Sequence, residues 1–184
     1  MRARYVFLVL VVLLLVAGGA YVAVRKLGES EETRRQALQP KVRAAFDGLR
    51  AELSAVHGIE LVLVSTRRTP EQQAAKVAAG VSATSNSWHL LGRAFDVQTA
   101  RKNAAGKIVA DPDGKDVASY QKLHELAKKY GLRGVPNGQP FDAKGAKAYI
   151  TTSSGKVWDV GHLEFAEGMT FAAAKAADEK AGLA

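Results

Sequence analysis

The chain has 184 residues, 47% of them hydrophobic, which is enough for one domain of ordinary size plus an appendage. It contains no cysteine, so disulfides and thiolate-bound metals are excluded. The formal net charge is +8, but four of the 26 basic residues flank an N-terminal apolar run, and the remainder has 22 basic against 18 acidic residues. This mild excess favours weak attraction to anionic polymers or membranes and does not indicate nucleic-acid binding.

The apolar run near the N-terminus predicts one transmembrane helix. Residues 5–24 carry no charge, and about 20 residues at helical rise span roughly 30 Å, the thickness of the hydrocarbon core of a bilayer. Basic residues flank the run on both sides, and the free amino terminus favours an N-inside orientation. The alternative is a cleaved signal peptide, because residues 18–20 are small enough to form a cleavage site. In both cases the rest of the chain is expected outside the cytoplasm, in the periplasm or cell envelope.

The remaining residues predict a polar linker followed by a single folded domain. We expect a membrane anchor over residues 1–26, a linker over residues 27–39 and the folded domain over residues 40–184. Helices are predicted by apolar residues three and four positions apart, by the capping Thr69 followed by Pro70, and by an Ala-rich run near the C-terminus. Short β-branched or apolar runs predict strands. The helices are expected at residues 40–57, 69–80, 116–130 and 171–180, and the strands at residues 59–65, 94–97, 148–152, 157–158 and 163–165.

The order of these elements predicts the fold class. Residues 99–115 are rich in Lys, Asn, Gly and Asp and are expected to form an exposed excursion, and residues 134–145 a loop. Helices segregated from short strands are typical of an α+β fold with a small, mostly antiparallel sheet and flanking helices.

Two motifs far apart in the chain contain residues that can bind a metal. Residues 87–96 follow the pattern S-x-H-x-x-G-x-A-x-D, and residues 158–164 follow W-D-x-x-H-x-E. His89, Asp96 and His162 would supply two imidazoles and one carboxylate, a donor set suited to zinc with a fourth position left open for catalysis. Asp159, three residues before His162, is then placed to act as a base on the attacking water.

These motifs resemble those of the zinc peptidases that include D-alanyl-D-alanine carboxypeptidases, L-alanoyl-D-glutamate endopeptidases and many phage endolysins. The resemblance covers roughly residues 61–165. It implies one Zn²⁺ per chain, held by His89, Asp96 and His162, and peptidoglycan peptides as substrates. It also implies that Asp159 is the general base and that residues 40–184 form the zinc peptidase domain.

Three further residues are predicted to contact the substrate. Arg68 lies in the segment S-T-R-R-T-P-E-Q-Q, which resembles a family segment whose arginine faces the substrate. Its guanidinium would hold a substrate carboxylate or stabilise a developing oxyanion. Arg67 is the alternative, because the residues before Arg68 depart from the family pattern. Ser87 and Gln73 are weaker candidates for substrate binding.

The spacing D-x-x-H at Asp159 is more similar to the endopeptidases, whereas the carboxypeptidases more often have E-x-x-H. Cleavage between L-Ala and D-Glu is therefore the favoured prediction. The alternatives are a D-Ala-D-Ala carboxypeptidase and a non-catalytic wall-binding module on the same fold. Glu164 is expected either to support His162 or to be solvated, and His124 is expected to be structural.

Overall fold

The computed structural model describes residues 30–134, 140–141, 147, 149–152, 154–157 and 159–183. The expected transmembrane helix at residues 5–24 lies outside this part of the chain. Of the helices that are described, none combines the length and apolar character needed to cross a membrane. The helical elements are α1 (Glu31–Gln36), α2 (Pro40–His57), α3 (Pro70–Ala78), η1 (Trp88–Leu91), α4 (Val117–Ala127), η2 (Lys128–Tyr130) and α5 (Phe171–Lys180). The strands are β1 (Glu60–Ser65), β2 (Ala94–Lys102), β3 (Ile108–Ala110), β4 (Ile150–Thr152), β5 (Gly155–Val157) and β6 (His162–Glu164).

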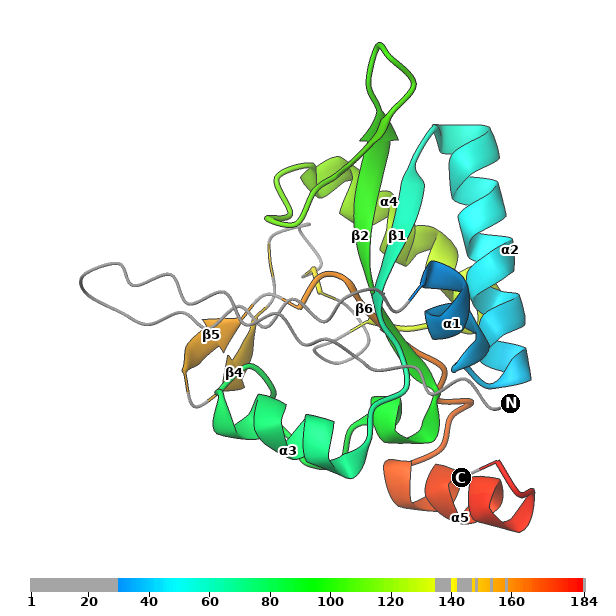
Figure 1. The fold of residues 1–184 in the computed structure, drawn as a ribbon, viewed down its shortest axis with the longest axis vertical. Coiled ribbons are helices and arrows are strands. Elements are labelled where there is room, and N and C mark those ends of the chain that lie inside the picture. The colour runs from blue at the N-terminus through cyan, green and yellow to red at the C-terminus, as the bar shows by residue number, and fades with distance from the viewer. Residues whose placement is uncertain are drawn as a thin grey trace, which may run out of the picture.

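Strand β2 is the centre of an antiparallel four-stranded sheet. β1 pairs with one edge of β2, while β3 and β6 pair with opposite ends of its other edge. β4 and β5 form a separate two-stranded sheet. Helices and a small antiparallel sheet thus make the expected α+β fold (Figure 1).

The two faces of the main sheet differ in chemistry. Alternate residues of β2 and β6, including Phe95, Val97 and Leu163, enter a core shared with α2 and α4. Because side chains alternate across a strand, Asp96 and His162 point to the opposite face. The packed core therefore fixes the sheet from one side and leaves polar side chains together on the other.

Two expectations from the sequence differ from the structure. Residues 99–115 were expected to form an exposed excursion, and residues 101–109 are exposed, but they are paired as a hairpin in which β2 continues to Lys102 and returns as β3. The hairpin is mostly solvent-exposed, so its sequence lacks the apolar alternation that indicates a half-buried strand. The turn is held by Asn103, whose side chain accepts hydrogen bonds from the backbone of Ala105 and Lys107.

The expected linker at residues 27–39 also differs, because its described part contains helix α1. Ser30 caps this helix by accepting a hydrogen bond from the backbone N–H of Thr33. Arg35 of α1 forms two hydrogen bonds with Asp47 of α2, at 2.5 and 2.6 Å. A six-residue helix is not stable on its own, so α1 depends on contacts such as this ion pair with α2. A local sequence pattern does not reveal a contact of this kind.

A buried ion pair attaches the C-terminal helix α5 to the sheet. Arg93, which directly precedes β2, donates to both carboxylate oxygens of Asp178 at 2.7 and 2.8 Å. Gln39 also donates to Asp178, at 2.7 Å, and Glu167 accepts from Arg93 at 2.8 Å. Burial alone would raise the pKa of Asp178, but the hydrogen bonds from Arg93 and Gln39 lower it below its ordinary value.

We expect Asp178→Ala to destabilise the fold by about 2–3 kcal/mol, because Nε and Nη2 of the buried Arg93 lose their acceptors and only Glu167 still pairs with this guanidinium. Denaturant unfolding measures this change. Glu179→Ala is the matched control. Glu179 pairs with Lys175 at 3.8 Å with both side chains 56% exposed, so its loss should cost no more than about 0.5 kcal/mol. Equal stability of the two variants would contradict this role of the Arg93–Asp178 pair.

Candidate metal centre

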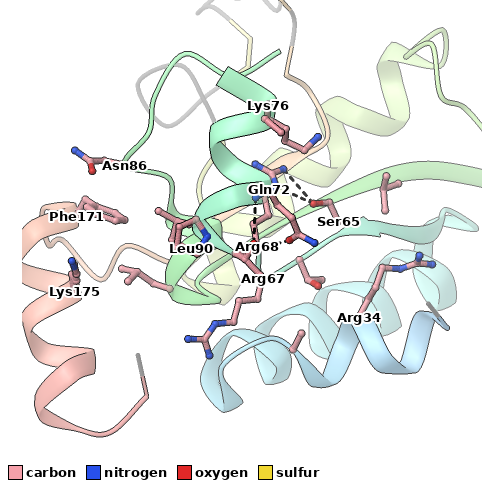
Figure 2. A pocket seen from close by; sticks show the side chains of 17 residues that line it. Arg34, Ser65, Arg67, Arg68, Gln72, Lys76, Asn86, Leu90, Phe171 and Lys175 are labelled. Atoms are coloured by element: carbon pink, nitrogen blue, oxygen red, sulfur yellow. Dashed lines mark hydrogen bonds between the residues drawn. The ribbon is translucent and has the colours of Figure 1, made fainter. Parts of the chain in front are cut away.

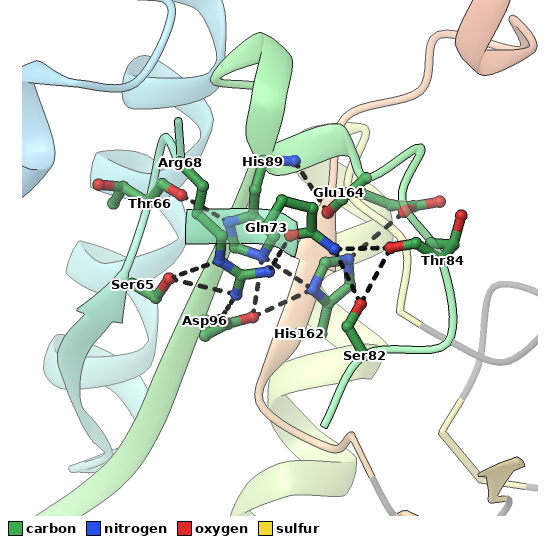
Figure 3. A network of polar contacts seen from close by, with 11 residues as sticks. Ser65, Thr66, Arg68, Gln73, Ser82, Thr84, His89, Asp96, His162 and Glu164 are labelled. Carbon is green, nitrogen blue, oxygen red and sulfur yellow. Dashed lines mark hydrogen bonds and ion pairs between the residues drawn. The ribbon is translucent and has the colours of Figure 1, made fainter. Parts of the chain in front are cut away.

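Three elements bring the predicted metal ligands together. His89 lies in η1, Asp96 in β2 and His162 in β6. One donor atom from each of these residues lies within 4.8 Å of the others, and they are a candidate metal-binding group among the described residues. Figure 3 shows their side chains converging between the sheet and the loop that contains Ser82 and Thr84.

Local backbone structure fixes His89. The side chain of Ser87 accepts a hydrogen bond from the backbone N–H of His89 at the start of η1. Gly92 ends η1 in the left-handed conformation, with φ of 66°, and a Cβ there would lie 3.1 Å from the carbonyl oxygen of Ala37. Both the turn and the close approach therefore favour glycine at this motif position.

The second ring nitrogen of His89 is held by a backbone carbonyl. Nδ1 lies 2.6 Å from the carbonyl oxygen of Thr66, and this contact requires Nδ1–H as the donor. The unprotonated Nε2 then faces Asp96 and His162. Burial lowers the pKa of His89, so the imidazole is neutral and its Nε2 lone pair is available to a metal.

Strand pairing places the other two ligands side by side. Asp96 of β2 and His162 of β6 are direct cross-strand partners. Nδ1 of His162 lies 3.0 Å from Oδ1 of Asp96, while its Nε2 lies 3.4 Å from a carboxylate oxygen of Glu164. An acceptor behind Nε2 favours the proton on that nitrogen and leaves Nδ1 as the metal donor.

Glu164 is in turn fixed by Arg133. Arg133 donates to Oε1 of Glu164 at 2.7 and 2.8 Å, and the backbones of the two residues exchange hydrogen bonds. Of the two roles that the sequence left open for Glu164, support for His162 is the one its position fits. No sequence pattern pointed to Arg133, because this residue lies in a loop and its partner Glu164 is 31 residues away.

The spacing of the donor atoms fits a single metal ion. The distances are 3.1 Å from His89 Nε2 to Asp96 Oδ1, 3.0 Å from His162 Nδ1 to the same oxygen, and 3.3 Å between the two nitrogens. Two ligands bound to zinc at 2.0–2.1 Å with tetrahedral angles lie about 3.3 Å apart. Because each histidine also has an acceptor on its far nitrogen, both the donors and their protonation suit a bound cation.

Asp159 lies in the cavity beside these ligands, at the turn that leads into β6. The cavity has a volume of about 350 Å³, and Ser87, Glu164 and the three predicted ligands line it as well. Burial raises the pKa of Asp159, and the nearby carboxylate of Asp96 raises it further, although His162 opposes the shift. A carboxyl group with a raised pKa next to a metal site suits proton transfer.

The turn that carries Asp159 is fixed from two sides. The backbone N–H of Val97 donates to the carbonyl of Gly161 at 2.9 Å, and a Cβ on Gly161 would lie 2.2 Å from the carbonyl oxygen of Val97. On the other side, Nε2 of His124 in α4 donates to the carbonyl of Val160 at 2.7 Å. Burial lowers the pKa of His124 to about 4, so it is neutral at pH 7, in agreement with the structural role expected from the sequence.

Arg68 lies at the site and contacts the predicted metal ligand Asp96. Its Nη2 donates to Oδ2 of Asp96 at 2.5 Å and to Ser65 Oγ at 3.2 Å. Its Nε donates to the same hydroxyl, and its Nη1 donates to Gln73 at 3.1 Å. Ser65 lies opposite Asp96 next to a bulge in β1, which directs the segment after β1 towards the ligands.

The other predicted substrate contacts differ in exposure. Gln73 is 1% exposed, and its amide nitrogen donates to Ser82 and to the carbonyl of Thr84. It therefore connects Arg68 to the loop that contains these two residues. Ser87 is buried but lines the cavity. Arg67, the alternative to Arg68, is exposed and lies outside the cavity that holds the metal ligands.

Comparison with known proteins supports the resemblance indicated by the two motifs. No family model matches the chain. The L-alanyl-D-glutamate peptidase of Listeria phage A118 is 40% identical over 72 residues, which are 38% of this chain and 26% of that protein. The chain therefore matches about a quarter of the length of this curated relative.

Solved structures with a similar arrangement include two peptidases. The L-Ala D-Glu endopeptidase ChiX of Serratia marcescens is 17% identical with a TM-score of 0.46, over 79% of this chain and 90% of that one. The vancomycin resistance D,D-pentapeptidase VanY, in complex with Zn(II), is 18% identical with a TM-score of 0.45, over 76% of each chain.

We expect the protein to bind one zinc ion with an affinity that rises with pH. Burial lowers the pKa of His162, but its hydrogen bonds with Asp96 and Glu164 dominate and raise it to about 10 in the metal-free site. Zinc must then displace this proton, so the apparent affinity should rise about tenfold per pH unit below that pKa. Competition titrations with a chelator at pH 6, 7 and 8 measure this dependence.

The controls for zinc binding are two histidine variants. His162→Ala should lose stoichiometric zinc, whereas His57→Ala, at the end of α2, should keep it. Elemental analysis gives the stoichiometry. An affinity that does not change with pH, or zinc retained by His162→Ala, would contradict the assignment of His162 as a ligand.

Proposed function

We propose that the protein is a zinc-dependent peptidase that hydrolyses peptidoglycan stem peptides at the bond between L-Ala and D-Glu. The observation that carries this proposal is the convergence of His89, Asp96 and His162 in one cavity with Asp159. The similarity to a protein named L-alanyl-D-glutamate peptidase supports the substrate class.

The chemistry divides between the metal and the protein. Zinc bound at this site would polarise the scissile carbonyl and increase the acidity of a water molecule. Asp159 would accept a proton from the attacking water and transfer it to the departing amine, and its raised pKa makes it able to act in both directions.

Arg68 would act mainly through Asp96. It donates four hydrogen bonds, to Asp96, Ser65 and Gln73, so at most one of its five N–H groups is left for another partner. One N–H can contact an oxyanion or a carboxylate, but it cannot form the two parallel bonds that clamp a terminal carboxylate. This arrangement favours an endopeptidase over the alternative D-Ala-D-Ala carboxypeptidase.

The third possibility is a wall-binding module that retains the metal without turnover. Asp159 argues against it, because a purely structural metal site needs no base in its cavity. A zymogram on purified cell wall separates the two: a cleared band indicates an enzyme, and binding without clearing indicates the module.

We also propose that residues 5–24 anchor the protein in the lipid bilayer, with residues 40–184 outside the cytoplasm. The uninterrupted apolar run supports an anchor, and the small residues at 18–20 keep signal cleavage as the alternative. Membrane fractionation followed by N-terminal sequencing distinguishes an intact anchored chain from a shortened soluble one.

Asp159→Ala should retain zinc and the fold but lose at least ~10²-fold in turnover, the usual scale for a general acid–base residue. Hydrolysis of a synthetic stem peptide measures the rate, and elemental analysis checks the zinc. Asp113→Ala, in the exposed segment before α4, is the matched control and should behave like the parent. Near-normal turnover by Asp159→Ala would assign the base elsewhere, with Glu164 the next candidate.

Mass spectrometry of digested muropeptides identifies the bond. We expect products cut between L-Ala and D-Glu, because the D-x-x-H spacing and the occupied guanidinium of Arg68 both favour an endopeptidase. Release of free D-Ala with the L-Ala–D-Glu bond intact would instead assign carboxypeptidase activity.

A further inference from the structure

A second, larger cavity adjoins the metal site. Its volume is about 1390 Å³, and its lining residues come from α1, α3, η1, α5 and the segment after β1 (Figure 2). Arg68, Lys76 and Asn86 line both this cavity and the one that holds the metal ligands. The two cavities therefore share part of one wall, next to the metal site.

The larger cavity is cationic. Its basic lining residues are Arg34, Arg67, Arg68, Lys76 and Lys175, and none of the described residues that line it is acidic. By contrast, the metal-site cavity contains Asp96, Asp159 and Glu164. The two adjoining cavities thus have opposite electrostatic character.

Most of these cations are not neutralised within the described part of the chain. Arg34, Arg67 and Lys76 form no ion pair with any described residue, and the pair of Lys175 with Glu179 is long, at 3.8 Å. The Nε of Arg34 is buried and has no hydrogen-bond partner among the described residues. Buried polar nitrogens are normally satisfied, and no described residue supplies an acceptor for this one.

We propose that the larger cavity, hereafter the cationic groove, binds the carboxylate-bearing part of the stem peptide. It would select peptides with free carboxylates over amidated ones. The proposal rests on the proposed function, since cleavage before D-Glu places the rest of the stem peptide, with its further carboxylates, on the departing side of the scissile bond. The volume exceeds the 300–1,000 Å³ typical of a small-molecule site, which favours an extended peptide over a single small anion.

Two synthetic stem peptides test this selectivity. They are identical except that the C-terminal carboxylate of the peptide, several residues beyond the scissile bond, is free in one and amidated in the other. The parent protein should cleave the acid with a kcat/KM about tenfold above that of the amide, mainly through KM. The triple variant Arg34→Gln, Arg67→Gln and Lys76→Gln should bring this ratio close to one, because each exposed ion pair contributes a factor of a few.

Matched variants separate a specific effect from loss of general charge or of folding. Lys107→Gln, Lys122→Gln and Lys128→Gln together remove the same charge from residues that do not line the groove, and this variant should keep the tenfold preference. If the groove triple variant does not fold, the single change Lys76→Glu should still lower the acid preference. An unchanged ratio in the groove variants, or no preference in the parent, overturns the proposal.

Binding measurements distinguish failure of the groove from failure of the proposed function. Titration calorimetry of both peptides on Asp159→Ala requires no turnover. Tighter binding of the acid without cleavage by the parent supports the groove and overturns the peptidase proposal. Equal binding of acid and amide overturns the groove proposal, and tight binding of inorganic polyphosphate in that case assigns the groove to a phosphate polymer instead.

Discussion

The carboxylate of Asp96 is the interaction on which the site depends. One of its oxygens lies within 3.1 Å of both histidines, and the other accepts from Arg68. Burial would raise the pKa of this carboxyl group, but the hydrogen bond and charge of His162, which is protonated in the metal-free site, help to hold it well below its ordinary value. A buried anion surrounded by donors is costly unless all of them are in place, so the sheet, η1 and the segment after β1 must be correctly positioned together.

Rigid supports behind each ligand make this positioning possible. The carbonyl of Thr66 holds His89, and Glu164 with Arg133 holds His162. Such partners determine both the orientation of a histidine and the nitrogen that faces the metal. The apolar core on the opposite face fixes β2 and β6, so that the donor atoms are already close enough for one ion without rearrangement.

The sequence predicted the parts of the structure that follow local rules. Helices α2 and α4 have apolar residues at helical spacing, α5 is rich in alanine, and the predicted metal ligands lie at the fixed offsets of their motifs. Interactions between distant residues were not predictable in this way. Arg93 and Asp178 are 85 residues apart, Arg133 and Glu164 are 31 apart, and neither pair has a pattern that connects its members. The cationic groove was also not predictable from the sequence, because its charged residues come from separate elements that only the fold brings together.

A crystal structure grown with zinc, with anomalous scattering at the zinc edge, tests the central claim most directly. The account predicts one zinc ion bound by Nε2 of His89, a carboxylate oxygen of Asp96 and Nδ1 of His162, with bonds of about 2.0–2.2 Å. Asp159 should lie beside the metal without binding it. An anomalous peak elsewhere, or zinc bound through Nε2 of His162, would contradict the account.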